Sequence, residues 1–385
     1  QLIYRKIDSV SGIAAKYAIP NEYDKMMTSM GSQETNAHTW VEETVYEENI
    51  PSNVVDKFLA VQAERFRNPV FRLFHTELEA VYEEKNRGLD NDLNKTWEAM
   101  LDALFPTHNY GQQTTIGTIE HLKNPSLTAI RNFYNEYYVP GNMAMIMSGD
   151  FNPDELVAKI DKAFSYMQAK PVTIYKGPVE KPITSPIIKE VFGPDAEFMQ
   201  MAYRLPGMTD YKTAITATVV SQILYNGKAG LLDVNLNKQQ KVLSSQASVQ
   251  NWKDYSLLLL SGKPRDGQSL EDVKALILSQ IGLLHKGEFD ESMVKAIVSN
   301  FKLSELKSIE NNDARADALM SSFIIHKGED WDKDVNFIDD MGKVTKQQVI
   351  DFVNTYLKDN YVAVMKRKGE NKNITKVENP PITPV

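Results

Sequence analysis

The sequence contains no cysteine. Disulfide bonds and thiolate metal sites are therefore excluded, and any bound metal ion must be held by His, Asp or Glu side chains. No run of roughly eighteen apolar residues is present, so the sequence predicts no membrane span. The densest apolar stretch, Leu257–Leu260, has the length of a buried strand.

Basic residues are in deficit, with 43 Lys and Arg against 51 Asp and Glu and a net charge of -8. A nucleic-acid partner normally requires a basic face, so this class of partner is excluded. The sequence also lacks the G-x-S-x-G, P-loop and G-x-G-x-x-G signatures. The six histidines include no pair with H-x-x-E-H or H-E-x-x-H spacing, so the chain contains no complete zinc-binding helix motif.

The segment from His75 to Asn91 (HTELEAVYEEKNRGLDN) has the most distinctive charge pattern. On a helix, Glu77, Val81 and Glu84 share one face, so two carboxylates flank an apolar residue. Carboxylates on a face that packs against a core need a metal ion or a cation as partner. The alternative is a solvated acidic helix, the usual meaning of a charge run. We expect this helix to continue past Trp97 to Leu104.

The remaining segments predict alternating helices and strands. Alternation over Thr35–Tyr46 predicts one strand, with a turn at 47–49. Further helices are predicted over 1–17, 21–30, 54–66, 126–137, 152–164, 210–224, 231–240, 270–285, 290–309, 315–326 and 345–357, and further strands over 143–148, 187–192, 197–203, 242–250, 255–262 and 361–366.

An internal repeat organises these elements. Ser126, Ile130, Phe133, Tyr137 and Ala144 recur, at one constant offset, as Thr345, Val349, Phe352, Tyr356 and Ala363. Each copy predicts a capped helix, a turn and an apolar strand, which indicates a duplicated α+β domain with helices on one face of a mostly antiparallel sheet. We expect a first domain over 1–170, a proline-rich linker over 171–186, a second, homologous domain over 187–370, and another linker over 371–385.

Three stretches together resemble the pitrilysin/insulinase family of zinc metallopeptidases, most closely its two-repeat bacterial members. They are the Gly…Asn-Ala-x-Thr pattern of Gly31, Asn36, Ala37 and Thr39, the E-x-x-x-V-x-x-E pattern of Glu77, Val81 and Glu84, and the helix-turn-strand segment from Phe133 to Gly149. The resemblance implies two homologous domains of the mitochondrial-processing-peptidase-like metallohydrolase fold, the first of them incomplete.

The resemblance also implies roles for individual residues. In this family the two histidines of H-x-x-E-H and a distal glutamate bind one Zn²⁺, and the glutamate of the motif activates the zinc-bound water. The distal ligand falls on Glu84, and a supporting catalytic-site acid falls on Glu77. An extended substrate strand is expected to pair with the main chain at Asn36, Ala37 and His38.

The H-x-x-E-H motif itself is absent, and the family places it upstream of the segment that matches Asn21. We therefore expect an inactive fragment, without Zn²⁺, of a metalloendopeptidase that hydrolyses peptides or unfolded polypeptides with a homologous C-terminal half or partner subunit. Bacterial relatives are often exported, which favours a periplasmic or secreted protein. One alternative is a noncatalytic peptide-binding or scaffold subunit of a peptidase-like complex, although the presence of both acids favours the enzyme. Another is a plain α+β interaction domain with an exposed acidic helix.

Overall fold

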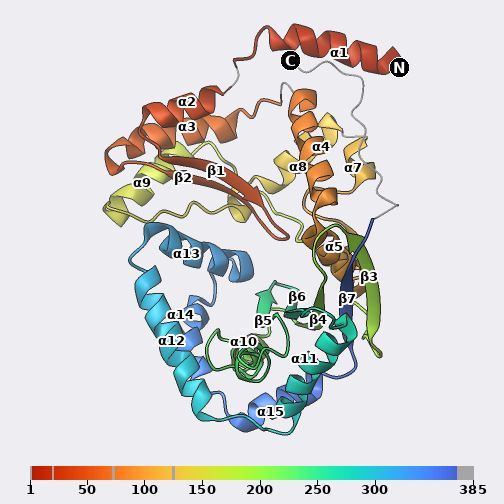
Figure 1. The fold of residues 1–385 in the computed structure, drawn as a ribbon. Helices are drawn as coiled ribbons and strands as arrows, with labels where there is room; N and C mark the ends of the chain where they lie inside the picture. The colour runs from red at the N-terminus through yellow and green to blue at the C-terminus, as the bar shows by residue number, and fades with distance from the viewer. Residues whose placement is uncertain (1, 20, 72–73, 124–125, 371–385) are drawn as a thin grey trace. The chain divides into compact units, whose positions relative to one another are not determined.

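Figure 1 shows the computed structural model, which describes residues 2–19, 21–71, 74–123 and 126–370. The chain forms two compact units. The first contains the described residues up to Arg87 together with 115–176, and the second contains 88–114 and the described residues from Gly177 onward. Residues 88–114 thus pack with the second unit, although they lie inside the predicted first domain, 1–170.

The first unit combines a hairpin with several helices. Its elements are α1(Leu2–Ala15), α2(Glu22–Ser29), β1(Glu34–Thr39), β2(Thr44–Asn49), α3(Val55–Arg67), most of α4(Phe74–Asp90), α7(Ile119–Lys123), α8(Leu127–Tyr137) and α9(Pro153–Ala163). Met27, Phe58, Leu59 and Leu156 form a small core that joins α2, α3 and α9. The apolar stripe of α3 was predicted from its spacing, and its buried members Phe58, Leu59, Gln62 and Ala63 confirm it.

Two strand predictions in this unit are wrong. The single strand predicted over Thr35–Tyr46 is a hairpin, because the Trp40 N–H donates to the Glu43 carbonyl (3.0 Å) and reverses the chain before β2. Residues 47–49 consequently lie in β2 rather than in a turn. The strand predicted over 143–148 is not formed, because these residues share no ladder with any strand in the described part of the chain.

The predicted long helix from 75 to 104 is two helices. Asn91 has extended backbone angles, and its side chain accepts a hydrogen bond from the Asn94 N–H (3.0 Å), which makes it the N-cap of α5(Asp92–Leu104). An asparagine inside an apparently continuous periodic pattern was the available signal for this break.

The second unit is built on the sheet β3-β7-β4-β6-β5, five strands among the described residues. The strands are β3(Ile187–Gly193), β4(Phe198–Pro206), β5(Ser244–Asn251), β6(Tyr255–Lys263) and β7(Tyr361–Lys368). Each neighbouring pair is antiparallel except β3 with β7. The helices are α5, α6(Asn109–Gln112), α10(Tyr211–Leu224), α11(Leu270–His285), α12(Ser292–Ser308), α13(Asn312–His326), α14(Trp331–Met341) and α15(Lys346–Tyr356). The predicted α+β class with a mostly antiparallel sheet is confirmed.

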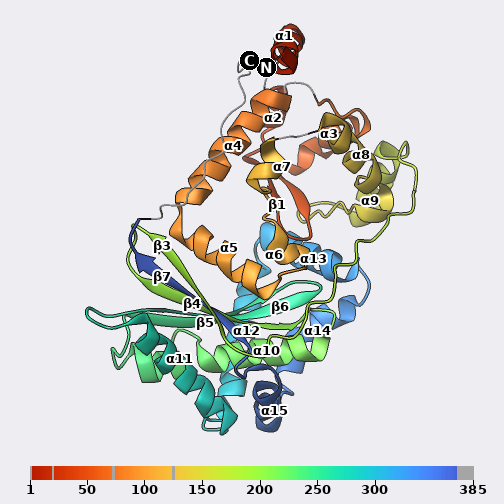
Figure 2. The ribbon, with the colours of Figure 1, turned by 90° about the vertical axis from the view of Figure 1, so that its right-hand side faces the viewer.

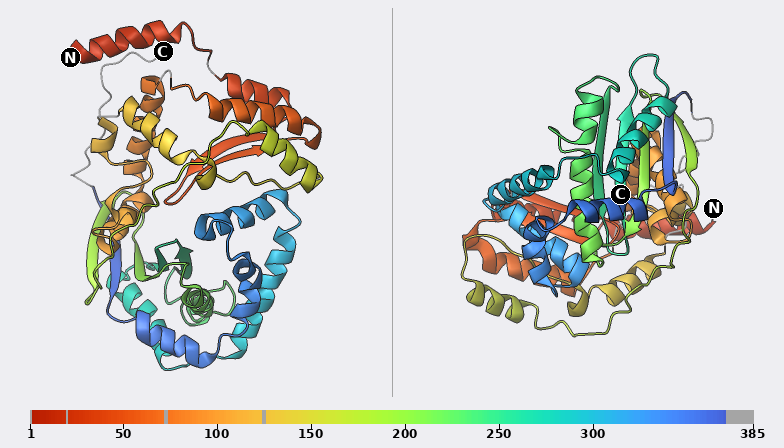
Figure 3. Two further views of the ribbon diagram at one scale, coloured as in Figure 1. Left: turned by 180° about the vertical axis from the view of Figure 1, so that it is seen from behind. Right: turned by 90° about the horizontal axis from the view of Figure 1, so that it is seen from below.

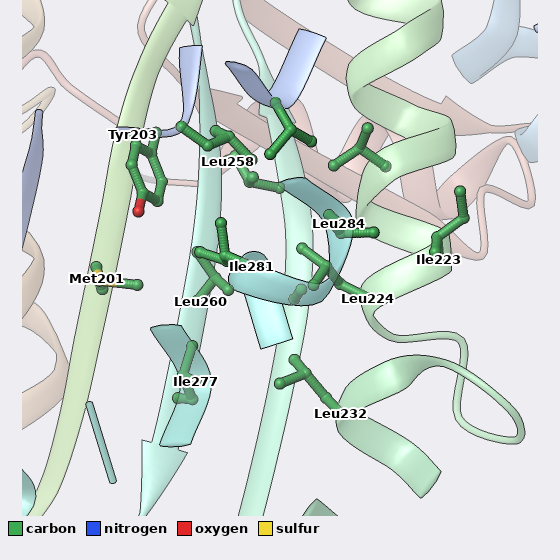
Figure 4. Close-up of a cluster of buried hydrophobic side chains, with 14 of the residues drawn as sticks. Met201, Tyr203, Ile223, Leu224, Leu232, Leu258, Leu260, Ile277, Ile281 and Leu284 are labelled. Carbon is green, nitrogen blue, oxygen red and sulfur yellow. The ribbon is translucent and has the colours of Figure 1, made fainter. Parts of the chain in front are cut away.

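Helices cover both faces of this sheet. Figure 2 and Figure 3 show α10, α11 and α15 on one face and α5 on the other. On the α10 side, Figure 4 shows Met201 and Tyr203 of β4 and Leu258 and Leu260 of β6 directed toward apolar side chains of α10 and α11. The alternate residue Arg204 points to the other face, where it donates to the Leu104 carbonyl at the end of α5.

Other elements differ from prediction for local reasons. The helix predicted over 231–240 contains a π-helical turn at Asp233–Asn237, closed by a hydrogen bond from the Lys238 N–H to the Asp233 carbonyl (2.8 Å). Helix α14 was not predicted, although Trp331, Val335, Ile338 and Met341 recur at helical spacing in its sequence. The hairpin of β5 and β6 has the predicted pairing.

The helical part of the internal repeat is matched by structure. Ser126 caps α8 by accepting from the Ala129 N–H (3.1 Å), and Thr345 caps α15 by accepting from the Gln348 N–H (3.2 Å). The strand part differs between the copies: β7 lies between β3 and β4, whereas residues 143–148 have no ladder.

Candidate functional site

Helix α4 carries the predicted acidic pair and is fixed by residues on a neighbouring side of the helix. Leu78 and Tyr82 are buried in a cluster with Leu122 of α7. The Tyr82 hydroxyl donates to the Leu122 carbonyl (2.8 Å), which sets the rotation of α4 about its axis. Burial raises the pKa of this hydroxyl, so it remains a neutral donor.

Glu77 and Glu84 lie on an exposed side of α4, with half-buried Val81 between them. Glu84 is seven positions after Glu77, which is about two turns of the helix. The two side chains therefore leave the same side of the helix, roughly 10 Å apart along its axis. Since each residue turns the helix by roughly 100°, the buried stripe at Leu78 lies about a quarter turn away from them. The two acids are therefore exposed rather than packed against a core, whereas Val81 between them packs against the cluster of Leu78 and Tyr82.

The β1–β2 hairpin presents a free strand edge. The Trp40 N–H donates a backbone hydrogen bond to the Glu43 carbonyl. In an antiparallel pair every second residue has its N–H and C=O directed toward the other strand, so the backbone groups of Asn36 and His38 face their partners Glu47 and Val45. The N–H and C=O groups of Ala37 then point away from β2, and no described strand pairs with that edge. The Asn36 side-chain oxygen accepts the outward Ala37 N–H (2.9 Å).

The His38 side chain is held by acids of the same hairpin. Its Nδ1 lies 2.7 Å from a Glu47 oxygen, and its Nε2 lies 3.9 Å from a Glu43 oxygen. Burial raises the pKa of Glu43, and the nearby His38 partly opposes that rise. Of the three predicted substrate-contact residues, Ala37 therefore offers main-chain groups at the free edge, whereas Asn36 and His38 support it with side chains.

Zinc does not fit the described residues by themselves. No group of three or more His, Asp or Glu side chains in the part of the chain that the structure describes could hold a metal ion. The resemblance assigns a ligand role to Glu84 alone, whereas a catalytic zinc site requires three protein ligands.

Among the described helices, none is long and apolar enough to cross a membrane.

A buried ionic cluster in the second unit was not predicted. In the second unit, Asp92 of α5 and Lys366 of β7 form an ion pair (2.8 Å) with both side chains fully buried. The Asp92 carboxylate also accepts from Lys95 (3.0 Å) and from the Asp195 N–H (3.0 Å). Lys366 lies within β7 after a run of apolar residues, and its place in the sequence gave no sign of a buried acidic partner. This cluster fastens α5 to the sheet and has no assigned chemical role.

Comparison with known proteins shows what this chain is similar to. A sequence profile described as "Peptidase M16 inactive domain" matches residues 126–301. A curated relative named zinc protease PqqE, from Helicobacter pylori, is 24% identical over 76% of this chain and 67% of its own length. A solved protease from Helicobacter pylori has the same fold, with a TM-score of 0.78 and 19% identity over 90% of this chain and 84% of that one.

A second solved structure, the periplasmic protease PqqL from Escherichia coli, has a TM-score of 0.72 and 16% identity over 90% of this chain. This chain covers 41% of that one, so it spans less than half of the PqqL length. The chain is thus similar to M16 peptidases in sequence, most clearly over residues 126–301, and in fold, which confirms the predicted resemblance to the pitrilysin/insulinase family.

Proposed function

We propose that this chain is part of a zinc-dependent metalloendopeptidase and supplies one zinc ligand and the strand edge that holds an extended peptide. The observation that carries the proposal is the exposed pair Glu77 and Glu84 on α4, which is anchored through Leu78 and Tyr82, in a chain whose relatives are named zinc proteases. Glu84 is the metal ligand and Glu77 is the supporting acid that orients the site.

The internal repeat supports a site completed by further elements. In the second unit, β4 joins the β5–β6 hairpin to β7, and α10 follows β4 in the chain. In the first unit, β1–β2 corresponds to that hairpin and residues 143–148 correspond to β7. Elements equivalent to β3, β4 and α10 would complete the first sheet, and the α10 equivalent is the helix expected to carry H-x-x-E-H. When bound there, zinc would polarise a peptide carbonyl and activate water.

The isolated chain is expected to show no zinc-dependent peptide cleavage, because it supplies one ligand and no general base. The measurement is cleavage of an unstructured fluorogenic peptide with and without added Zn²⁺, together with metal content by mass spectrometry. A protein that includes an H-x-x-E-H segment is the positive control. Cleavage by the isolated chain that is lost with a chelator and restored by zinc would overturn the proposal that this chain supplies only one zinc ligand and no general base.

Substrate pairing at the free edge is expected to depend on the Ala37 N–H. Ala37→Pro removes an outward donor without removing a ladder bond, so substrate affinity should fall by roughly five- to tenfold, the value of about one hydrogen bond. In the complete protein, KM for an extended peptide measures this loss. Ala37→Val retains the N–H and is the matched control. Equal KM values for the two variants would argue against strand addition at β1.

A noncatalytic binding or scaffold subunit is the second candidate, favoured by the description of the matching profile as an inactive domain. Intact mass and N-terminal peptides of the native protein distinguish the two candidates. An H-x-x-E-H helix supports the peptidase, and the same helix with its histidines replaced supports the scaffold. For the peptidase we propose a periplasmic or secreted location and a homologous second half, because the similar PqqL is named a periplasmic protease and is more than twice as long.

A further inference from the structure

A shallow pocket in the first unit lies beside β2, because the hydroxyl of its lining residue Tyr138 is 2.9 Å from that of Tyr46. Its volume is about 280 Å³, and its walls come from the end of α3, the end of α8 and the segment after α9. Its lining includes Phe66, Arg67, Tyr134, Tyr138, Tyr166 and Lys170. This volume is close to the lower end of the range for small-ligand pockets and suits one large side chain rather than a long segment.

Two of the lining tyrosines are held in place by the backbone of α3, and the third, Tyr138, has its hydroxyl 2.9 Å from that of Tyr46 in β2. The Tyr134 hydroxyl donates to the Phe66 carbonyl (2.8 Å), and the Tyr166 hydroxyl donates to the Ala63 carbonyl (2.9 Å). The Tyr134 and Tyr138 rings are stacked with their centroids 4.4 Å apart. The aromatic wall is therefore formed before any ligand binds, which reduces the entropy lost on binding.

The charge of the pocket is positive. Arg67 and Lys170 line it, and no acidic side chain is among its described lining residues. The Arg67 guanidinium lies 4.2 Å from the Tyr166 ring centroid, and its ion pair with Glu64, at 3.7 Å, is longer than a direct hydrogen bond. Burial raises the pKa of Tyr134 to about 12 and also raises the pKa values of Tyr138 and Tyr166, so these hydroxyls carry no negative charge.

We propose that this pocket binds the C-terminal residue of a peptide that ends in an aromatic side chain. The aromatic ring packs against Tyr134 and Tyr138, and the terminal carboxylate accepts hydrogen bonds from Arg67 and Lys170. Two cations beside a stacked aromatic wall are complementary to this pairing of a carboxylate with a ring. Each cleavage of a peptide bond creates one product with a new terminal carboxylate, so the inference rests on and extends the proposed function, but the binding itself needs no metal.

The test is calorimetric titration of the chain, with a chelator present, by acetyl-Ala-Ala-Phe as the free acid and as the amide. The acid should bind at least about tenfold more tightly than the amide, because only the acid can form charge-assisted hydrogen bonds. Arg67→Gln should reduce the affinity for the acid to that for the amide. Arg131→Gln is the matched control, because Arg131 also lies near an aromatic ring, 5.9 Å from that of Phe71, but does not line the pocket.

Equal affinity for acid and amide, no binding at millimolar peptide, or an unchanged acid affinity in Arg67→Gln would each overturn the proposal. Circular dichroism establishes whether each variant is folded, and Lys170→Gln supplies a second variant if Arg67→Gln is not. Because the titration is performed without metal, it can contradict the peptide-binding proposal without contradicting the zinc peptidase proposal. The zinc peptidase proposal is tested separately, by cleavage and metal content.

Discussion

Asp92→Ala is expected to destabilise the second unit by roughly 3–5 kcal/mol, the usual effect of removing one partner from a buried ion pair. The substitution leaves the Lys366 ammonium fully buried, with only the carbonyl oxygens of Asp195 and Ala196 as neighbours that accept its hydrogen bonds. Lys366→Met should have a smaller effect, because Asp92 then keeps Lys95 and the Asp195 N–H. Urea unfolding followed by tryptophan fluorescence measures both effects.

The matched control for this prediction is Asp339→Asn, which removes the exposed pair of Lys302 and Asp339 (2.6 Å). An exposed pair contributes about 0–1 kcal/mol, so the midpoint of unfolding should hardly change. Gly193 shows how closely Asp92 is packed, since a Cβ at that position would lie 1.7 Å from an Asp92 oxygen. Comparable losses in Asp92→Ala and Asp339→Asn would show that the buried cluster does not hold α5 to the sheet.

The same cluster gives stability a pH dependence. Burial by itself would raise the pKa of Asp92, but hydrogen bonds from Lys366, Lys95 and the Asp195 N–H outweigh burial and lower it. A carboxyl whose pKa is lower in the folded state stabilises that state above its unfolded pKa of about 3.9, and this contribution is lost as pH falls through the folded pKa. Asp92→Ala should therefore flatten the acid limb of the wild-type stability curve below about pH 4.

The sequence predicted elements whose signals are local and strong. The stripe of α3 and the β5–β6 hairpin follow from apolar spacing alone. The β1–β2 turn was missed because Trp40–Glu43 contains no glycine, proline or asparagine. The α4–α5 break was missed because the helical pattern continues on both sides of Asn91, the one residue that signals it. The Asp92–Lys366 pair could not be predicted, since the two residues are far apart in the sequence and only the folded sheet brings them together.

The candidate site was predictable to the extent that it lies on one element. Spacing correctly placed Glu77 and Glu84 on the same side of one helix, but it could not show which side is buried, because that depends on Leu122 of α7, far along the chain. Alternation placed Ala37 in a strand, but which main-chain groups are free depends on the register with β2. Packing between elements distant in sequence thus decides what local patterns leave open.

In the complete protein, Glu84→Gln is expected to lower zinc affinity by more than about 100-fold and to lower kcat/KM for peptide cleavage with it. The substitution keeps the shape of the side chain but removes the anionic oxygen of a metal ligand. Glu77→Gln should lower zinc affinity less, by about 10–100-fold, as expected for a residue that orients a ligand. Both acids are exposed, so neither change should shift the unfolding midpoint of the chain appreciably.

Glu83→Gln is the control for this series, because Glu83 is an equally exposed acid on α4 that projects roughly 100° away from Glu84. Zinc per chain after dialysis against a zinc buffer, and kcat/KM on an unstructured peptide, distinguish the three variants. We expect the loss of zinc and of kcat/KM to be largest in Glu84→Gln, intermediate in Glu77→Gln and absent in Glu83→Gln. This order would show that Glu84 binds the metal directly and that the effect does not come from the overall negative charge of the helix. If Glu84→Gln keeps its zinc and its rate, the exposed acids of α4 form a solvated face, and the chain acts as an interaction domain instead.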